Sequence, residues 1–141
     1  MDTVTDAVLA ANAQFYRALS LADSEAMRRV WLNSAEAVCA HPGHPPLVGW
    51  EAISASWRAI FEHQGILRVW PSDARVRLFE QTAEVLCFEN IDVGQAPQGG
   101  IVRAQATNLF RRAGQVWKLV EHHALPLPHV DPQPVELYSS N

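Results

Sequence analysis

Apolar residues in the first third of the chain recur every three or four positions, the spacing that places them on one face of an α-helix. Residues 3–20 contain the clearest stripe, formed by Val4, Val8, Ala11, Phe15, Ala18 and Leu19. Asp23 and Ser24 both belong to residue types favoured at helix N-caps and predict a shorter second helix. A third stripe lies between Gly49 and Gly65. The pattern therefore predicts three amphipathic helices, each with one face to bury.

From residue 66 onwards the apolar pattern changes to that of β-strands. A bulge or turn is expected at 71–73, and strands are expected at 35–40, 67–70, 74–79, 82–93, 101–112 and 115–124. The turn at Ala113-Gly114 makes the last two strands a β-hairpin. Several strands are apolar on both faces. We therefore expect helices to cover one face of the sheet and a second copy of the chain to cover the other.

The order of these elements predicts an α+β fold, in which three N-terminal helices pack on the concave face of a curved sheet. The space between helices and sheet is the natural place for a ligand. We expect one domain over residues 1–125. The remaining residues, 126–141, contain four prolines, which favour a separate tail.

Composition narrows the classes of function. The chain has 141 residues, 48% of them apolar and 18% charged, which is typical of one globular domain. A net charge of −4 argues against nucleic acid as a partner, because phosphate binding requires a basic surface. No apolar run approaches the roughly 20 residues that span a bilayer, so no membrane association is expected. The N-terminus shows no secretory signal pattern and the two cysteines are expected to be buried and reduced, which favours the cytoplasm.

Several segments together resemble the nuclear transport factor 2-like superfamily, which includes ketosteroid isomerases and SnoaL-like polyketide cyclases. The similarity is carried by Phe15-Tyr16, residues 23–31, His41-Pro42, Gly49, and residues 53–57, 106–112 and 117–123. It extends over nearly the whole chain up to Pro126. The resemblance implies a cone-shaped, cystatin-like α+β roll with a mixed or antiparallel sheet and, commonly, a homodimer formed through the outer sheet face. It is specific for the fold and not for an activity, because one fold supports many functions.

Three residues are candidate catalytic groups: His41, Tyr16 and His123. The resemblance to ketosteroid isomerases implies a catalytic base just before a proline after the first strand, where this chain has His41 rather than Asp. It also implies an oxyanion-binding tyrosine in the first helix, where Tyr16 stands. The second, protonated acid of that oxyanion hole has no evident counterpart in the sequence. Histidine is a suitable general base near neutral pH, and the alternative role for His41 is a strand cap bonded to a loop carbonyl.

His122 and His123 are neighbours in a strand and therefore point to opposite faces. His123 shares its face with Trp117 and Leu119, whereas His122 shares its face with Lys118. We expect His123 to point into the pocket, unless a single β-bulge reverses the alternation.

Candidate ligand-binding residues are Trp31, Trp57, Phe61, Phe88 and Asn108. One or two of the aromatic rings would form a flat apolar wall, although core packing is the favoured explanation for each ring taken singly. The amide of Asn108 would bind a ligand or, alternatively, satisfy neighbouring polar groups of the sheet. No metal is expected, because His41, His44 and His123 match no standard zinc spacing. No organic cofactor is expected either, since the sequence has no glycine-rich phosphate-binding loop.

Two functions of different class stay open. The first is a cofactor-independent isomerase, cyclase or dehydratase that acts on a small apolar carbonyl compound, with His41 as the base. In this hypothesis Tyr16, Asn108 or His123 would stabilise the developing oxyanion. The second is a non-catalytic ligand-binding or dimeric assembly module with the same fold. The sequence leaves open whether the chain is an enzyme and favours a homodimer in both cases.

Overall fold

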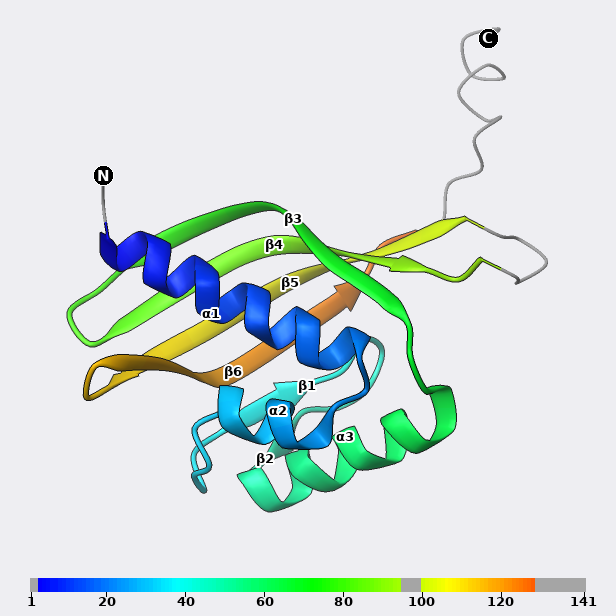
Figure 1. Ribbon diagram of the computed structural model, residues 1–141, viewed down its shortest axis with the longest axis horizontal. Helices are drawn as coiled ribbons and strands as arrows, with labels where there is room; N and C mark the ends of the chain where they lie inside the picture. Colours follow the sequence, from blue (N-terminus) through cyan, green and yellow to red (C-terminus); the bar gives the residue numbers. More distant parts are fainter. Residues whose placement is uncertain (1–2, 95–99, 129–141) are drawn as a thin grey trace, which may run out of the picture.

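The computed structural model describes residues 3–94 and 100–128 as three helices packed against one face of a six-stranded sheet (Figure 1). The helices are α1 (Thr3–Ser20), α2 (Ser24–Val30) and α3 (Trp50–Gln64). The strands are β1 (Val38–Ala40), β2 (Leu47–Val48), β3 (Arg68–Leu78), β4 (Thr82–Asp92), β5 (Ile101–Ala113) and β6 (Val116–Pro126). Figure 1 shows α1 lying along the sheet, with α2 and α3 beside the short strands. The predicted α+β architecture, a curved sheet over three helices, is confirmed.

The helices begin and end where the sequence signals predict. Asp23 caps α2, because its side chain accepts a hydrogen bond from the N–H of Ala26 at 3.0 Å. Gly65 ends α3 with a φ of 69°, a conformation that residues with a side chain rarely adopt. Ser20 ties the end of α1 to the sheet, since its hydroxyl donates to the carbonyl of Val69 and accepts from the N–H of the same residue. The contacts of Ser20 fix the end of α1 relative to β3.

The sheet has the strand order β2-β1-β6-β5-β4-β3. The long strands β3 to β6 form an antiparallel meander, whereas β1 pairs with β6 in parallel, so the sheet is mixed. This topology puts β6 in the interior of the sheet. His122 of β6 consequently has Cys39 opposite it on β1 and Asn108 opposite it on β5. The polar end of the final hairpin therefore lies beneath the helices and not at an edge.

Two β-bulges bend the sheet around the helices. The first lies in β3 between Ser72 and Arg75, where the sequence predicts a bulge or turn, and it includes Asp73 at a φ of 54°. The second lies between β5 and β6. There Leu109 pairs with Glu121 and Phe110 pairs with Leu119, which leaves Val120 as an extra residue in β6. The second bulge changes which side chains of β6 face the interior.

The core between helices and sheet is mostly apolar, and its largest fully buried side chains include Trp31, Phe15, Phe110 and Leu119. Burial of such groups supplies the main driving force for this packing. The same interior also contains the polar side chains of Asn12, Glu89, Asn108 and His122. Buried polar groups require partners, so this set marks the place to look for function.

The expected division between domain and tail is not tested by the structure and stays a prediction. Strand β6 continues to Pro126, one residue past the expected domain end. Most of the expected tail, residues 129–141, and residues 95–99 of the expected turn at 94–100 lie outside the described residues. Within the ranges 3–94 and 100–128, no helix is both long and apolar enough to cross a membrane. The cytoplasmic location stays a prediction.

Candidate functional site

A buried polar cluster joins α1 to the three central strands. The hydroxyl of Tyr16 donates to Glu89 Oε2 at 2.8 Å. The side-chain amide of Asn108 donates to Asn12 Oδ1 at 2.9 Å and to the Tyr16 hydroxyl at 3.1 Å. His122 Nδ1 lies 2.6 Å from Asn108 Oδ1. These five residues are the polar cluster, and each is at most 3% exposed.

Each member of the polar cluster comes from the apolar face of its element. Asn12 and Tyr16 lie one helical turn apart on the buried stripe of α1. Glu89 continues the inward row of β4 after Val85 and Cys87. Polar groups at such positions cost free energy unless they are hydrogen-bonded. The network of hydrogen bonds is therefore what makes polar residues tolerable at these core positions.

His122, and not His123, points into the interior. His122 is 2% exposed, whereas the side chain of His123 is 42% exposed and its Nε2 lies 3.0 Å from Glu121 Oε1. The prediction that His123 faces the pocket is therefore wrong. The cause is the bulge at Val120: Leu119 and Val120 are both buried, so the alternation is reversed from the next residue onwards. His122 takes the interior place that was expected for its neighbour.

The hydrogen bonds assign the tautomer of His122. The amide nitrogen of Asn108 is a donor to Asn12 and Tyr16, so its Oδ1 is an acceptor and His122 Nδ1 carries the hydrogen. The other ring nitrogen, Nε2, is then an acceptor in the neutral imidazole, and it lies 3.5 Å from Glu89 Oε2. A proton on Glu89 consequently faces a basic nitrogen.

Burial favours the neutral forms of this pair over an ion pair. Desolvation raises the pKa of the Glu89 carboxyl to about 7, and the hydrogen bond from Tyr16 only partly opposes it. Desolvation also lowers the pKa of His122 to about 3, with smaller contributions from His41 and His123. The pKa of the Tyr16 hydroxyl is raised, first by burial and then by the charge of Glu89, so Tyr16 acts as a donor. At neutral pH Glu89 is thus close to half-protonated beside a neutral imidazole.

His41 follows β1 and is half-buried beside α3. Its Nε2 lies 3.0 Å from Ser56 Oγ, and that hydroxyl donates to the carbonyl of Ile53 at 2.7 Å. The hydroxyl therefore accepts from Nε2, which leaves Nδ1 of His41 as the basic nitrogen. Burial, and to a smaller extent His44, lowers the pKa of His41, so its neutral form is favoured. Its hydrogen-bond partners are the hydroxyl of Ser56 at 3.0 Å and the thiol of Cys39 at 3.8 Å, and not the loop carbonyl considered from the sequence.

Aromatic rings connect His41 to the polar cluster. The ring of Trp57 lies 4.7 Å from that of His41 and 6.3 Å from that of His122. Phe15 lies 4.9 Å from the ring of His122 on the side of α1. The indole Nε1 of Trp57 is buried and has no hydrogen-bond partner among the described residues. Such an orphan donor is rare in a core, and an oxygen atom of a ligand or a water would satisfy it.

The structure places four of the five predicted ligand-binding residues in the interior. Trp31, Trp57 and Phe61 are at most 8% exposed, and Asn108 is fully buried within the polar cluster. Whether any of them binds a ligand stays a prediction. The interior position of Asn108 follows from strand alternation, because it shares its face with Ala106 and Phe110.

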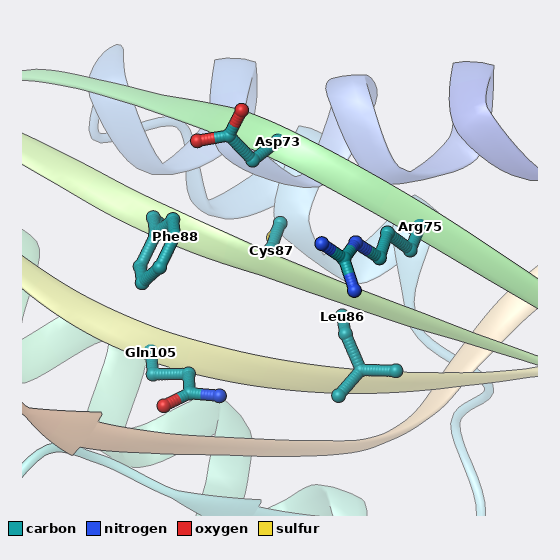
Figure 2. A pocket seen from close by; sticks show the side chains of 6 residues that line it. All are labelled: Asp73, Arg75, Leu86, Cys87, Phe88 and Gln105. Atoms are coloured by element: carbon teal, nitrogen blue, oxygen red, sulfur yellow. The ribbon is translucent and has the colours of Figure 1, made fainter.

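Phe88 lies on the outer face of β4, so the prediction that it helps to form the interior pocket is wrong. The alternation of β4 turns Cys87 and Glu89 inwards and Phe88 outwards, where the guanidinium of Arg103 covers its ring at 4.2 Å. Figure 2 shows Phe88 in a hollow of about 230 Å³ on this face. The other residues that line the hollow are Asp73, Arg75, Leu86, Cys87 and Gln105. The polar cluster is on the opposite side of the sheet.

The described parts of the chain contain no group of side chains arranged as metal ligands. No group of three or more His, Cys, Asp or Glu side chains there is placed to hold a metal ion. His41, His44 and His123, the convergence considered from the sequence, do not form such a group. Cys39 and Cys87 are both buried, and burial raises the pKa of each thiol. Neither cysteine has the depressed pKa of a reactive thiolate.

Sequence reasoning missed two titratable members of the site, Glu89 and His122, together with Asn12. The signal for Glu89 was present, because strand alternation puts it on the same face as Val85 and Cys87. Asn12 likewise interrupts the apolar stripe of α1. A charged or polar residue on an otherwise apolar face is the signal that finds both. Glu89 is a buried carboxyl with a raised pKa, a kind of group that was not predicted from the sequence.

Comparison with known proteins agrees with this architecture. The sequence profile of the SnoaL-like domain family matches residues 8–126. The chain belongs to the SnoaL-like domain family. A crystal structure from Streptomyces avermitilis, an NTF2-like family protein with a provisional dehydratase assignment, is similar with a TM-score of 0.82. It is 33% identical in sequence, over 91% of this chain and 99% of that chain.

Other relatives of this SnoaL-like protein have different descriptions. A Thiobacillus denitrificans structure, provisionally described as a calcium/calmodulin-dependent protein kinase type II association domain, has a TM-score of 0.78. It is 29% identical, over 85% of this chain and 94% of that one. The F-box protein SKIP8 of Arabidopsis thaliana is 25% identical over 120 residues, which are 85% of this chain. The chain spans about half, 49%, of the length of that relative.

Proposed function

We propose that this SnoaL-like protein is a cofactor-independent dehydratase that acts on a small, mostly apolar β-hydroxy carbonyl compound. The observation that carries the proposal is a base and an acid whose environments push their pKa values in opposite directions. His41 has a lowered pKa and is held in its neutral form, whereas Glu89 has a raised pKa and keeps its proton close to pH 7. Two titratable groups with opposed shifts are the usual basis for assigning a base and an acid.

In the proposed reaction, His41 takes up one proton and Glu89 gives up one proton. His41 Nδ1 removes the proton from the carbon next to the carbonyl, and the electron pair forms the carbon–carbon double bond as the carbon–oxygen bond of the hydroxyl breaks. Glu89 gives its proton to the departing hydroxyl, which leaves as water. The proton on His41 then returns to Glu89 through solvent. The neutral imidazole of His122, with Nε2 3.5 Å from Glu89 Oε2, carries no positive charge that would hold Glu89 ionised.

The remaining members of the site bind and orient the ligand. Tyr16 and Asn108 are buried donors that bond Glu89, Asn12 and each other, and each would exchange one of these hydrogen bonds for the carbonyl oxygen as negative charge develops on it. Trp57 offers an apolar wall next to His41 and an indole N–H that has no hydrogen-bond partner among the described residues. This arrangement suits a ligand with one or two oxygen atoms on an apolar body. The provisional dehydratase assignment of the 33% identical Streptomyces avermitilis protein gives further support.

Dehydration of a panel of β-hydroxy ketones, followed by the absorbance of the conjugated product, tests this function. His41→Gln and Glu89→Gln should each lower turnover of any substrate found by on the order of a hundredfold or more. Glu84→Gln is the matched control, because Glu84 lies on the same strand but on its outer face, paired with Arg77 at 3.3 Å. If both site variants turn over a confirmed substrate as fast as the control does, the proposal fails.

A second role, homodimer formation through the outer face of the sheet, is supported by a separate observation. Leu86 and Phe88 lie half-buried on that face around the hollow shown in Figure 2, and no other element of the described chain covers it. Sedimentation at micromolar concentration should give a dimer. Leu86→Glu should give a monomer, whereas Ile66→Glu, an exposed position outside the sheet, should not. A monomeric wild-type protein would contradict this proposal and leave the catalytic one unaffected.

A further inference from the structure

A second hollow, of about 480 Å³, lies where the end of α1, the helix α2 and the start of β6 meet. Its volume is within the range of small-molecule sites. It is lined by residues of α1, α2 and β6 and of the turn between the two helices, and it shares no lining residue with the hollow on the outer face of the sheet. None of its lining residues belongs to the polar cluster. It is therefore separate from the proposed reaction site.

The rim of this hollow is positively charged. Arg17, Arg29 and Lys118 line it, and the only carboxylate in its lining is that of Asp23. Asp23 is already engaged, because it accepts the N–H of Ala26 as the cap of α2. The chain as a whole has a net charge of −4, so three cations around one hollow are a local reversal of sign. Such a concentration of charge attracts anions.

Two of these cations, each in the last turn of its helix, have little compensation from carboxylate groups. In the described part of the chain, Arg17 forms no ion pair with a carboxylate. Arg29 lies 3.5 Å from Glu25, but both side chains are about 60% exposed, and such a surface pair is weak. The guanidinium groups therefore keep donors that an anion from solution can use.

The third cation is held in place. Lys118 donates from Nζ to the backbone carbonyl of Arg29 at the end of α2, which connects β6 to the helix across the hollow. An ammonium has three donors, so this contact leaves two for a ligand. Beneath the cations the lining is apolar: Ala18 and Val30 are buried, and Leu21 is 48% exposed. The hollow thus combines an anchored charge with an apolar surface.

We propose that this hollow binds a small amphiphilic organic anion, with its carboxylate between Arg17 and Lys118 and its short apolar body against Leu21 and Val30. The carboxylate accepts from the guanidinium and the ammonium, which are the strongest hydrogen-bond donors available in a protein. The apolar body removes the exposed face of Leu21 from water. The site does not depend on the proposed dehydratase activity.

Titration of ¹⁵N-labelled protein with hexanoate, followed by amide chemical shifts, tests the proposal. The amides of Arg17, Leu21 and Lys118 should shift saturably. Arg17→Gln, which removes a cation with no intramolecular ion-pair partner, should weaken binding about tenfold, since one charge-assisted hydrogen bond is lost. Lys118→Gln should have a similar effect. Arg58→Gln is the control, because Arg58 is an exposed cation on α3 bonded to Ser54 and outside the hollow.

Two further ligands test separately whether the charge and the apolar body of the anion are recognised. Hexanol should bind at least about tenfold more weakly than hexanoate if the charge is recognised, and acetate should do the same if the apolar body is recognised. Hexanoate shifts that do not saturate, or that Arg17→Gln leaves unchanged, would overturn the proposal. Equal binding of hexanol or of acetate would also overturn it. The dispersion of the amide spectrum shows for each variant that the fold is intact.

Discussion

His122 Nε2 lies 3.5 Å from Glu89 Oε2 in the core of the domain, and neither side chain is more than 4% exposed. In water these groups would form an ion pair near neutral pH. In this interior, desolvation disfavours both charges, and no lysine or arginine of the described residues pairs with Glu89. The carboxyl of Glu89 therefore keeps its proton up to about pH 7, beside the neutral imidazole. This relationship connects the fold to the proposed chemistry and makes its consequences measurable.

The rate of dehydration should depend on pH as the base and the acid require. Activity needs neutral His41 and protonated Glu89. With the pKa of Glu89 raised to about 7, kcat/KM should fall as pH rises through about 7. On the acid side it should fall only below the lowered pKa of His41. A rate that keeps rising above pH 8 would contradict the role of Glu89 as the acid.

Replacing Glu89 should change the pH dependence of stability in a definite direction. A carboxyl whose pKa is about 7 in the folded chain and 4.5 in the unfolded chain binds more protons when folded between these values. Its contribution to the free energy of unfolding therefore falls as pH rises from about 4.5 to about 7, by up to about 3 kcal/mol. Glu89→Gln removes this loss. Relative to wild type, the variant should gain stability between pH 4.5 and 7 in urea denaturation.

His122 changes the free energy of unfolding with pH in the direction opposite to that of Glu89. Its pKa is about 3 when folded and 6.5 when unfolded, so its stabilising effect is lost as pH falls from about 6.5 towards 3. Of these two pH dependences of stability, only that of His122 should remain in Glu89→Gln. If the variant is instead less stable than wild type by a constant or growing amount up to pH 7, Glu89 is ionised and held by a charged His122.

Substitution of the two adjacent histidines should change the stability of the fold by very different amounts. His122→Ala leaves the Oδ1 of Asn108 unpaired and a cavity in the core, which together should cost about 3 kcal/mol of stability. His123→Ala removes a half-exposed side chain and should change stability by about 0.5 kcal/mol or less. Denaturant midpoints measure both. Equal effects would mean that the bulge at Val120 does not hold in solution.

Asn108 connects three other members of the polar cluster and should be the most sensitive of its neutral residues. Asn108→Leu leaves Asn12, Tyr16 and His122 each without one partner, at a cost of about 3 kcal/mol or more. Gln105→Leu is the matched control on the outer face of the same strand, and it should be within about 0.5 kcal/mol of wild type. A control as destabilised as Asn108→Leu would show that β5 tolerates no change at either face.

The helices and most strands could be predicted because their signals are local. The stripe from Val4 to Leu19, the cap at Asp23 and the turn at Gly114 each act within a few residues of themselves. Even the bulge in β3 was signalled by Pro71 and Asp73. Periodicity and capping therefore predict the long elements. The two-residue strand β2 and the parallel pairing of β1 with β6 have no such local signal.

The site could be predicted only in part, because it depends on long-range pairing. Val120 has no local feature of a bulge; its place is set by the pairing of β6 with β5 and by the burial of two successive apolar residues. That one residue decides which histidine meets Glu89. The pKa values of the pair follow from burial beneath α1, which the sequence of β4 and β6 does not contain. Tyr16 and Asn108 were found because they lie on regular elements.

Titration of the Glu89 side-chain carboxyl, followed by its ¹³C chemical shift, measures whether this group holds a proton at neutral pH. Comparison with Glu89→Gln assigns the resonance. We expect a midpoint near pH 7, because desolvation outweighs the hydrogen bond from Tyr16. Glu89 is then an acid that can give its proton to a leaving hydroxyl. A midpoint below pH 5 would mean a permanent carboxylate at neutral pH, and the proposed acid would not exist.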